Sequence, residues 1–103
     1  MYRYAQSCEV LYGHWNEAMT ACDELNKLAS DKGIRPARVL APVVGHDNWL
    51  ILEIEYDDLA QYQRETARFY GDADLMGAYR KLAAQVVQGT SESTLYMDAP
   101  HVS

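Results

Sequence analysis

The chain has 103 residues, of which 49% are hydrophobic and 23% charged, values typical of one globular domain spanning residues 1–103. Its formal net charge is −6, because 15 acidic residues outnumber nine Lys and Arg residues. The basic residues form no cluster, and an acidic surface repels a phosphate backbone. We therefore exclude nucleic acid as a partner.

The beginning of the chain, MYRYAQSCEVLYGHW, lacks the basic start and continuous apolar run of a secretory signal. No apolar stretch approaches the ~18 residues that a membrane span needs. We therefore expect a cytoplasmic protein with no membrane partner. In a reducing compartment Cys8 and Cys22 stay free thiols, and both fall at positions that we expect to face the core.

The first half of the chain predicts three strands and one helix. Residues 2–11 are rich in Tyr and Val with rough alternation, which predicts a strand. Apolar residues recur every three or four positions over residues 14–32, which predicts an amphipathic helix that Gly33 ends in a left-handed conformation. A second strand is predicted over residues 35–44, and a tight GHDN turn leads to a third over residues 49–56.

The second half predicts a broken helix and a last strand. Asp57 or Asp58 can cap a helix whose spacing continues to Gly71, and Asp72 or Asp74 can cap a second segment reaching Gly89. A last strand follows over residues 90–98, and then a tail. The order βαββαβ predicts an α+β, ferredoxin-like sandwich: a four-stranded antiparallel sheet with the helices on one face.

The third strand has one apolar and one mixed face. Its apolar face suits a helix layer and carries Leu50, Leu52, Ile54 and Tyr56, whereas its mixed face carries Trp49, Ile51, Glu53 and Glu55. The tight turn would place Val44 opposite Trp49, Leu40 opposite Glu53 and Arg38 opposite Glu55.

The helices cannot cover this mixed face, which leaves three interpretations of it. A second copy of the chain could bury its apolar part, with Arg38 paired to Glu53 or Glu55 in a homodimer interface that includes Leu40, Trp49 and Ile51. The glutamates could instead be solvated, with Trp49 exposed. They could also form a catalytic carboxylate pair, since same-face carboxylates can have separated pKa values. We favour the homodimer.

The runs LILEIEYDDLAQYQRE and DADLMGAYRKLAAQV, followed by a final strand, resemble the dimeric α+β barrel superfamily. This superfamily includes NIPSNAP-like, antibiotic-biosynthesis-monooxygenase-like, EthD-like and haem-degrading proteins. The resemblance extends over nearly the whole chain. It implies that two protomers pack sheet to sheet into a barrel and that each protomer has a ligand cavity between its sheet and its helices.

The resemblance also implies site residues. The Asn of the haem-degrading group falls near Gln6, the Trp at the end of the third strand falls at Tyr56, and the haem-ligating His falls at or beside Tyr79. Because position 79 carries no imidazole, we expect no haem and no other cofactor. Gln6, Tyr56 and Tyr79 are then expected to line a pocket, with Trp15 and Tyr62 nearby.

Few other residues of the sequence suggest catalysis or metal binding. His14, His46 and His101 lack the spacing of a metal pair, so we expect no metal. His14 could be a general base or a solvated helix cap. The eight tyrosines could be core aromatics with their tips at the surface, or they could line a pocket for an aromatic ligand.

Two classes of function remain open. One is a cofactor-independent monooxygenase or cyclase/isomerase that acts on an aromatic or polyketide-like small molecule. The other is a non-catalytic dimeric ligand-binding or accessory protein of the same fold.

Overall fold

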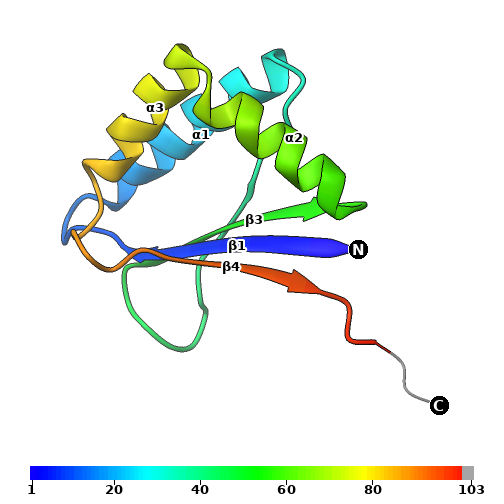
Figure 1. Ribbon diagram of the computed structural model, residues 1–103. Helices are drawn as coiled ribbons and strands as arrows, with labels where there is room; N and C mark the ends of the chain where they lie inside the picture. Colours follow the sequence, from blue (N-terminus) through cyan, green and yellow to red (C-terminus); the bar gives the residue numbers. More distant parts are fainter. Residues whose placement is uncertain (101–103) are drawn as a thin grey trace.

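A computed structural model describes residues 1–100 (Figure 1). The expected tail begins within these residues, but its end, residues 101–103 with His101, lies outside them. The elements, in chain order, are β1 (Tyr2–Glu9), α1 (Trp15–Asp31), β2 (Arg38–Leu40), β3 (Trp49–Tyr56), α2 (Leu59–Tyr70), α3 (Ala73–Ala83) and β4 (Glu92–Met97).

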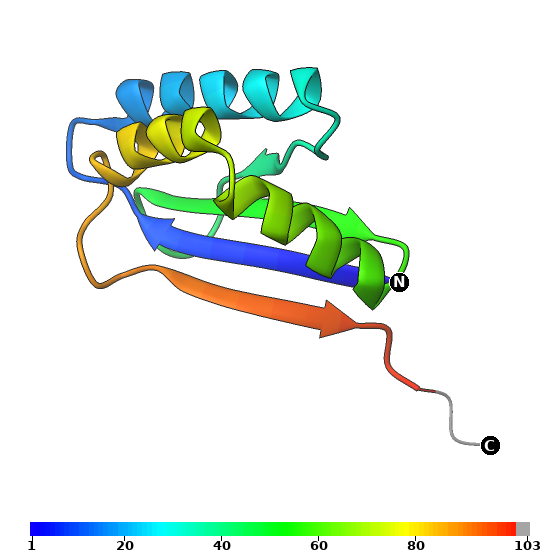
Figure 2. The ribbon, with the colours of Figure 1, turned by 45° about the horizontal axis from the view of Figure 1, so that its top comes forward.

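The four strands form one antiparallel sheet in the order β2-β3-β1-β4. All three helices lie on the same face of this sheet, as the two views of the ribbon show (Figures 1 and 2). This is the predicted ferredoxin-like α+β architecture. The opposite face of the sheet has no cover from the described part of the chain.

Helix α1 is followed by the left-handed turn at Gly33 that the sequence predicts. Gly33 has a φ of +73°, and its N–H donates to the carbonyl of Ser30. The N–H of Ile34 donates to the carbonyl of Ala29 over 2.9 Å. These two bonds make a Schellman motif, which turns the chain back so that Ile34 packs with Ala29 in the core.

The predicted break between the second and third helices is present. The Asp58 carboxylate accepts a hydrogen bond from the Gln61 N–H to cap α2, and Asp72 accepts from the Leu75 N–H to cap α3. The prediction that the second segment reaches Gly89 is wrong, since α3 ends at Ala83. Past it residues 84–85 form a turn, and the segment 85–87 pairs with the end of β1: the N–H of Val87 donates to the carbonyl of Glu9 over 2.8 Å.

The predictions for the second strand need correction. β2 has three residues instead of the ten predicted, and Pro36 and Pro42 flank it without amide hydrogens for a ladder. The tight turn is instead a loop over residues 41–48. Arg38 therefore lies opposite Glu53, not Glu55, and Leu40 lies opposite Ile51, not Glu53. Because the error is two residues, each side chain stays on the predicted face.

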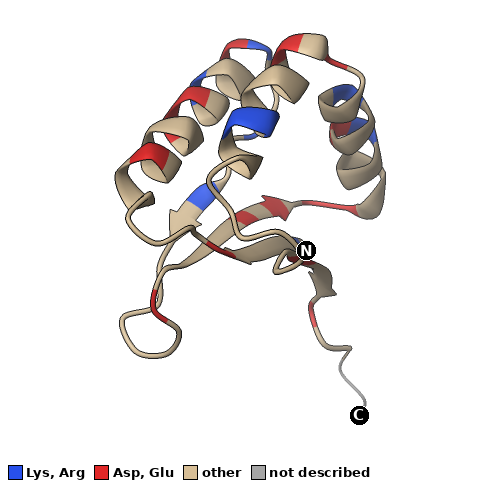
Figure 3. Cartoon of the chain, turned by 90° about the vertical axis from the view of Figure 1, so that its left-hand side faces the viewer, with Lys and Arg blue, Asp and Glu red and all other residues tan. Residues whose placement is uncertain are grey.

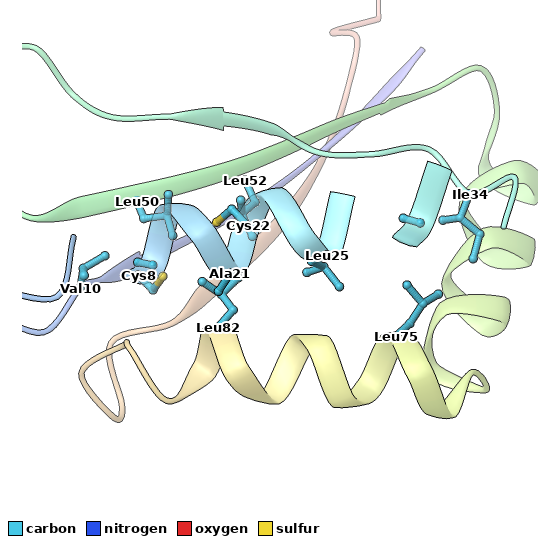
Figure 4. Close-up of a cluster of buried hydrophobic side chains, with 12 residues drawn as sticks. Cys8, Val10, Ala21, Cys22, Leu25, Ile34, Leu50, Leu52, Leu75 and Leu82 are labelled. Carbon is cyan, nitrogen blue, oxygen red and sulfur yellow. The ribbon is translucent and has the colours of Figure 1, made fainter. Parts of the chain in front are cut away.

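The hydrophobic core lies between the sheet, α1 and α3 (Figure 4). Both thiols belong to it, as predicted: Cys8 and Cys22 are buried and unpaired. Leu50 of β3 and Leu75 of α3 are fully buried there. Helix α2, by contrast, has no fully buried residue, although one of its faces turns toward the sheet.

Candidate functional site

A cavity of about 120 Å³ lies where α2 faces the sheet. Six of its lining residues are aromatic, and they come from β1, β3, α2 and α3: Tyr4, Tyr56, Tyr62, Phe69, Tyr70 and Tyr79. Tyr70 is 57% exposed, so this side of the cavity borders solvent. An apolar cavity of about 150 Å³ takes up benzene, so a space of about 120 Å³ is close to the size of one aromatic ring.

Gln6 and Tyr79 meet at one end of this cavity. The Gln6 Nε2 group donates a hydrogen bond of 2.8 Å to the Tyr79 hydroxyl oxygen, which leaves the Tyr79 proton and the Gln6 carbonyl oxygen for other partners. Even-numbered residues of β1 face the helices, because Cys8 and Val10 on this face are buried in the core. The strand alternation therefore brings Gln6 under Tyr79 of α3.

Tyr56 and Tyr62 lie on the other side of the cavity. Their ring centroids are 5.4 Å apart in an edge-to-face arrangement, and the ring of Tyr62 is 6.1 Å from that of Tyr4. Burial is the main cause that raises the pKa of Tyr56, to about 12, and burial also raises the pKa of Tyr4 and of Tyr70. These hydroxyls keep their protons at neutral pH and are hydrogen-bond donors there.

Trp15 does not line this cavity, although the pocket prediction placed it nearby. Trp15 packs on the core in the first turn of α1, at the opposite end of the helix from the part that lines the cavity. Helix α1 is about 25 Å long, so its two ends cannot share one small cavity. His14 precedes Trp15, is exposed, and has Nδ1 2.8 Å from the Gln85 side-chain oxygen.

The sequence analysis missed a charged corner of the cavity. Glu65 lines it with a side chain only 12% exposed, and its Oε1 accepts a 2.9 Å hydrogen bond from the Arg35 N–H. The Arg35 guanidinium is also anchored, since Nη1 donates to the carbonyl of Glu55 over 2.6 Å. A signal for Glu65 existed, because it falls three residues after Tyr62 and four before Phe69 on the inward stripe of α2.

The residues predicted to form the dimer interface lie together on the uncovered face of the sheet. There Glu53 is within 3.6 Å of both Arg38 and Arg3, and its side chain is only 15% exposed. Arg3 also donates a 3.1 Å hydrogen bond to Glu55. Both glutamates are thus paired with arginines inside one chain, and Arg3 is a partner that the sequence analysis missed.

Apolar side chains flank this charged cluster. Leu40, Trp49 and Ile51 are half-buried, and Trp49 stacks on His46 with ring centroids 5.1 Å apart. The loop 41–48 projects to the side away from the helices (Figures 1 and 3). Two valines at its tip, Val43 and Val44, are 100% and 91% exposed.

Acidic and basic positions both occur along the helices, interleaved with uncharged ones (Figure 3). Within residues 1–100, no three His, Cys, Asp or Glu side chains gather into a group that could hold a metal ion. None of the helices in this part of the chain is long and apolar enough to cross a membrane.

Comparison with known proteins supports the fold. No protein-family model matches the sequence, and no curated protein matches it either. Solved structures do match. A NIPSNAP domain protein of unknown function from Burkholderia xenovorans is 15% identical, with a TM-score of 0.76 over 100% of this chain and 99% of that one.

Two further structures agree. A NIPSNAP family protein from Agrobacterium tumefaciens is 13% identical, with a TM-score of 0.75 over 95% of this chain and 85% of that one. A candidate antibiotic biosynthesis monooxygenase from Nitrosomonas europaea is 11% identical, with a TM-score of 0.70 over 95% and 98%. The chain has the fold of these proteins. The predicted resemblance is thereby confirmed for the fold, and at these identities the activity does not follow from it.

Proposed function

We propose that this protein binds a small aromatic molecule with a single ring in the cavity between α2 and the sheet. The aromatic wall around a space of about 120 Å³ carries the proposal. Its size favours one ring over the polycyclic, polyketide-like ligand that the sequence analysis also considered, because pockets for drug-sized ligands span ~300–1,000 Å³. The Tyr79 hydroxyl and the Gln6 carbonyl oxygen offer a donor and an acceptor to a phenolic group.

Thermal unfolding with and without phenol tests this proposal. We expect phenol at about tenfold over its Kd to raise the Tm of the wild-type chain by several degrees, because a ligand of the folded state stabilises it. Tyr79→Leu should show a much smaller shift. Tyr12→Leu is the matched control, since Tyr12 is 92% exposed and lies outside the cavity. Equal shifts in the wild type and Tyr79→Leu would place the binding elsewhere.

Catalysis by this site is a second candidate function, favoured by Glu65. A carboxylate inside an aromatic cavity can take a proton from a bound phenol, and protonated tyrosines can donate hydrogen bonds to the oxyanion that forms. These groups suit cofactor-independent oxygenation, cyclisation or isomerisation. Neither a metal nor haem is part of this proposal.

Oxygen uptake with 1,4-hydroquinone, without added metal or cofactor, tests the catalytic candidate. We expect turnover above the buffer rate and a loss of 100-fold or more in Glu65→Gln, the usual contribution of a general base. The Kd for phenol should change little, because the substitution keeps the shape of the side chain. Turnover equal to buffer, or unchanged in Glu65→Gln, would leave a binding protein without this activity.

We propose further that the protein is a cytoplasmic homodimer whose protomers meet through the uncovered sheet face. Trp49, Ile51 and Leu40 supply apolar surface there, and the exposed Val43 and Val44 extend it beyond the edge of the sheet. The arginine–glutamate pairs within each chain lower the cost of burying charge at such an interface.

Sedimentation tests the homodimer. At micromolar concentration we expect about twice the chain mass of 11.7 kDa. Trp49→Arg should shift the population toward the single chain, because it adds a charge where burial is expected. Ala60→Arg adds the same charge to an exposed site on the helix side and should not change the mass. A wild-type chain that sediments as a monomer would contradict the proposal.

A further inference from the structure

A second cavity adjoins the first. It has a volume of about 460 Å³ and lies under the C-terminal end of α3, where the chain leaves the helix toward β4. Its wall differs in kind from that of the first cavity. Tyr79 is the one aromatic residue among those that line it, and Gln6, Gln88 and Ser91 supply its polar side chains. Its apolar part consists of Cys8, Leu52, Leu82, Ala83, Val86 and Val87.

The two cavities share a boundary made by Gln6, Leu52 and Tyr79, which line both of them. Gln6 and Leu52 are directly paired across β1 and β3, and the Tyr79 hydroxyl is hydrogen-bonded to Gln6 above this pair. The boundary is therefore formed by one residue pair of the sheet, Gln6 and Leu52, with the Tyr79 side chain over it. Both polar groups are neutral, so their hydrogen bond is easily exchanged for one to a ligand.

The cavities are aligned along the strands. On the helix-facing side of β1, successive residues are about 7 Å apart. Tyr4, opposite Ile54, lies in the first cavity, and the pair of Gln6 and Leu52 forms the boundary. Cys8 lies one rung further, in the second cavity. A ligand that extends from the first cavity along β1 therefore reaches the second within about 7 Å, the spacing of residues on one face of a strand.

We propose that the second cavity binds an aliphatic substituent of the same ligand, so that the site as a whole takes an alkyl-substituted single-ring phenol. This inference rests on the proposed aromatic ligand of the first cavity. The aromatic walls of the first cavity hold the ring, the rung of Gln6 and Leu52 supports the ring–chain junction, and the aliphatic walls of the second cavity hold the chain. The Tyr79 hydroxyl turns from Gln6 toward the phenol as the chain passes.

Calorimetric titration of the full chain with phenol and with 2-butylphenol, whose hydroxyl and butyl chain are adjacent on the ring, tests the inference. Each buried methylene contributes up to about fourfold in affinity, so we expect 2-butylphenol to bind the wild type at least tenfold more tightly than phenol. Ala83→Trp fills the second cavity from an exposed helix position that lines it. In this variant phenol should keep its Kd, and the gain from the butyl chain should be lost.

Two further variants keep the test decisive. Ser91→Trp fills the same cavity from the opposite rim and should also lose the butyl gain, in case Ala83→Trp does not fold. Ala73→Trp places the same ring at an exposed site at the start of α3, outside both cavities, and should keep the gain. Circular dichroism establishes which variants are folded.

The outcomes separate this inference from the proposed function. If phenol does not bind the wild type, the proposed aromatic site is wrong. If phenol binds but 2-butylphenol binds no more tightly, the second cavity takes no chain and the inference is overturned. It is also overturned if the butyl gain persists in both filled variants.

Discussion

The two ends of the helix layer differ in how closely they cover the sheet. At one end, α1 and α3 cover β3 so closely that Leu50 and Leu75 are fully buried. At the other end, α2 lies over Tyr4 and buries no residue completely. The side chains that α2 turns toward the sheet surround a cavity.

The difference follows from side-chain chemistry. The close-packed end is built mainly from Ala, Leu, Val and Cys, which interdigitate without polar atoms. The other end is built from tyrosines with Glu65 and Arg35, whose polar groups must reach water or one another. The packing under α1 thus supplies stability, and the space under α2 has room for a ring. The second cavity borders the packed end on its α3 side, where no residue of α1 lines it. Three predictions test this division, beginning with the largest expected effect.

Truncation of a β3 side chain should affect stability more at the packed end of the helix layer than at the cavity end. Leu50 and Ile54 point to the same face of β3, but Leu50 is fully buried whereas Ile54 lines the cavity. Leu50→Ala should lower the free energy of unfolding in urea by about 2–5 kcal/mol, because it leaves a void in a packed core. Ile54→Ala should cost only about 1–2 kcal/mol, since it enlarges an existing space. Equal losses would contradict the division.

Alkaline pH should destabilise the fold through two buried groups, the Cys22 thiol in the core and the Tyr56 hydroxyl beside the cavity. Burial raises the pKa of the Cys22 thiol from 9.0 to about 11 and that of Tyr56 from 10.0 to about 12. The folded chain therefore holds these protons to higher pH than the unfolded chain does. The stability that they contribute is fully present below pH 9, and it is lost over pH 9–11 for Cys22 and over pH 10–12 for Tyr56.

Urea unfolding at several pH values measures this loss. Cys22→Ala should flatten the decline of stability between pH 9 and 11, and Tyr56→Phe should flatten it between pH 10 and 12. The two windows overlap only between pH 10 and 11, so below pH 10 and above pH 11 each substitution is the control for the other. A decline that keeps its full slope in both variants would show that other groups cause it.

Removal of the α2 cap should have the smallest effect. Asp58→Ala deletes the carboxylate that accepts from the Gln61 N–H over 2.7 Å, a change that typically costs about 1 kcal/mol. Because α2 has no buried anchor in its first turn, the Gln61 amide hydrogen should exchange faster with solvent.

Asp31→Ala is the matched control for this cap. Asp31 is an exposed carboxylate in the last turn of α1, where a negative charge is not favoured by the helix dipole. Its removal should leave stability unchanged or slightly higher. If Asp58→Ala and Asp31→Ala behave alike, the Asp58 cap does not stabilise α2.

The lengths of the segments between strands and helices were the weakest part of the sequence analysis. The hydrophobic alternation of residues 49–56 defined β3 correctly, but the second strand and its turn were misjudged. Pro36 and Pro42 limit β2 to three residues, and the loop 41–48 that follows moves Arg38 from Glu55 to Glu53. Periodicity contains no information on loop length, so only the folded sheet determined this register.

The candidate site was predicted in part for a similar reason. Strand parity indicated that Gln6 and Tyr56 face the helices, and helical spacing put Tyr79 on the inward stripe of α3. Trp15 was grouped with them although the length of α1 places it far from the cavity. Glu65 was missed because a carboxylate at an inward position resembles a surface residue until its partner is known. That partner, Arg35, is 30 residues away in the chain.

The sequence by itself determined the order of the elements, the inward and outward faces of β1 and β3, the break between α2 and α3, and the end of α1 at Gly33. These features depend on near neighbours in the chain, through alternation, helical spacing and capping. Tertiary structure alone decided the register of β2, the pairing of Arg3 and Arg38 with the same glutamate, and the two adjoining cavities. The physical reason is that each of these depends on side chains brought together from distant segments, and their separation is set by packing across the sheet.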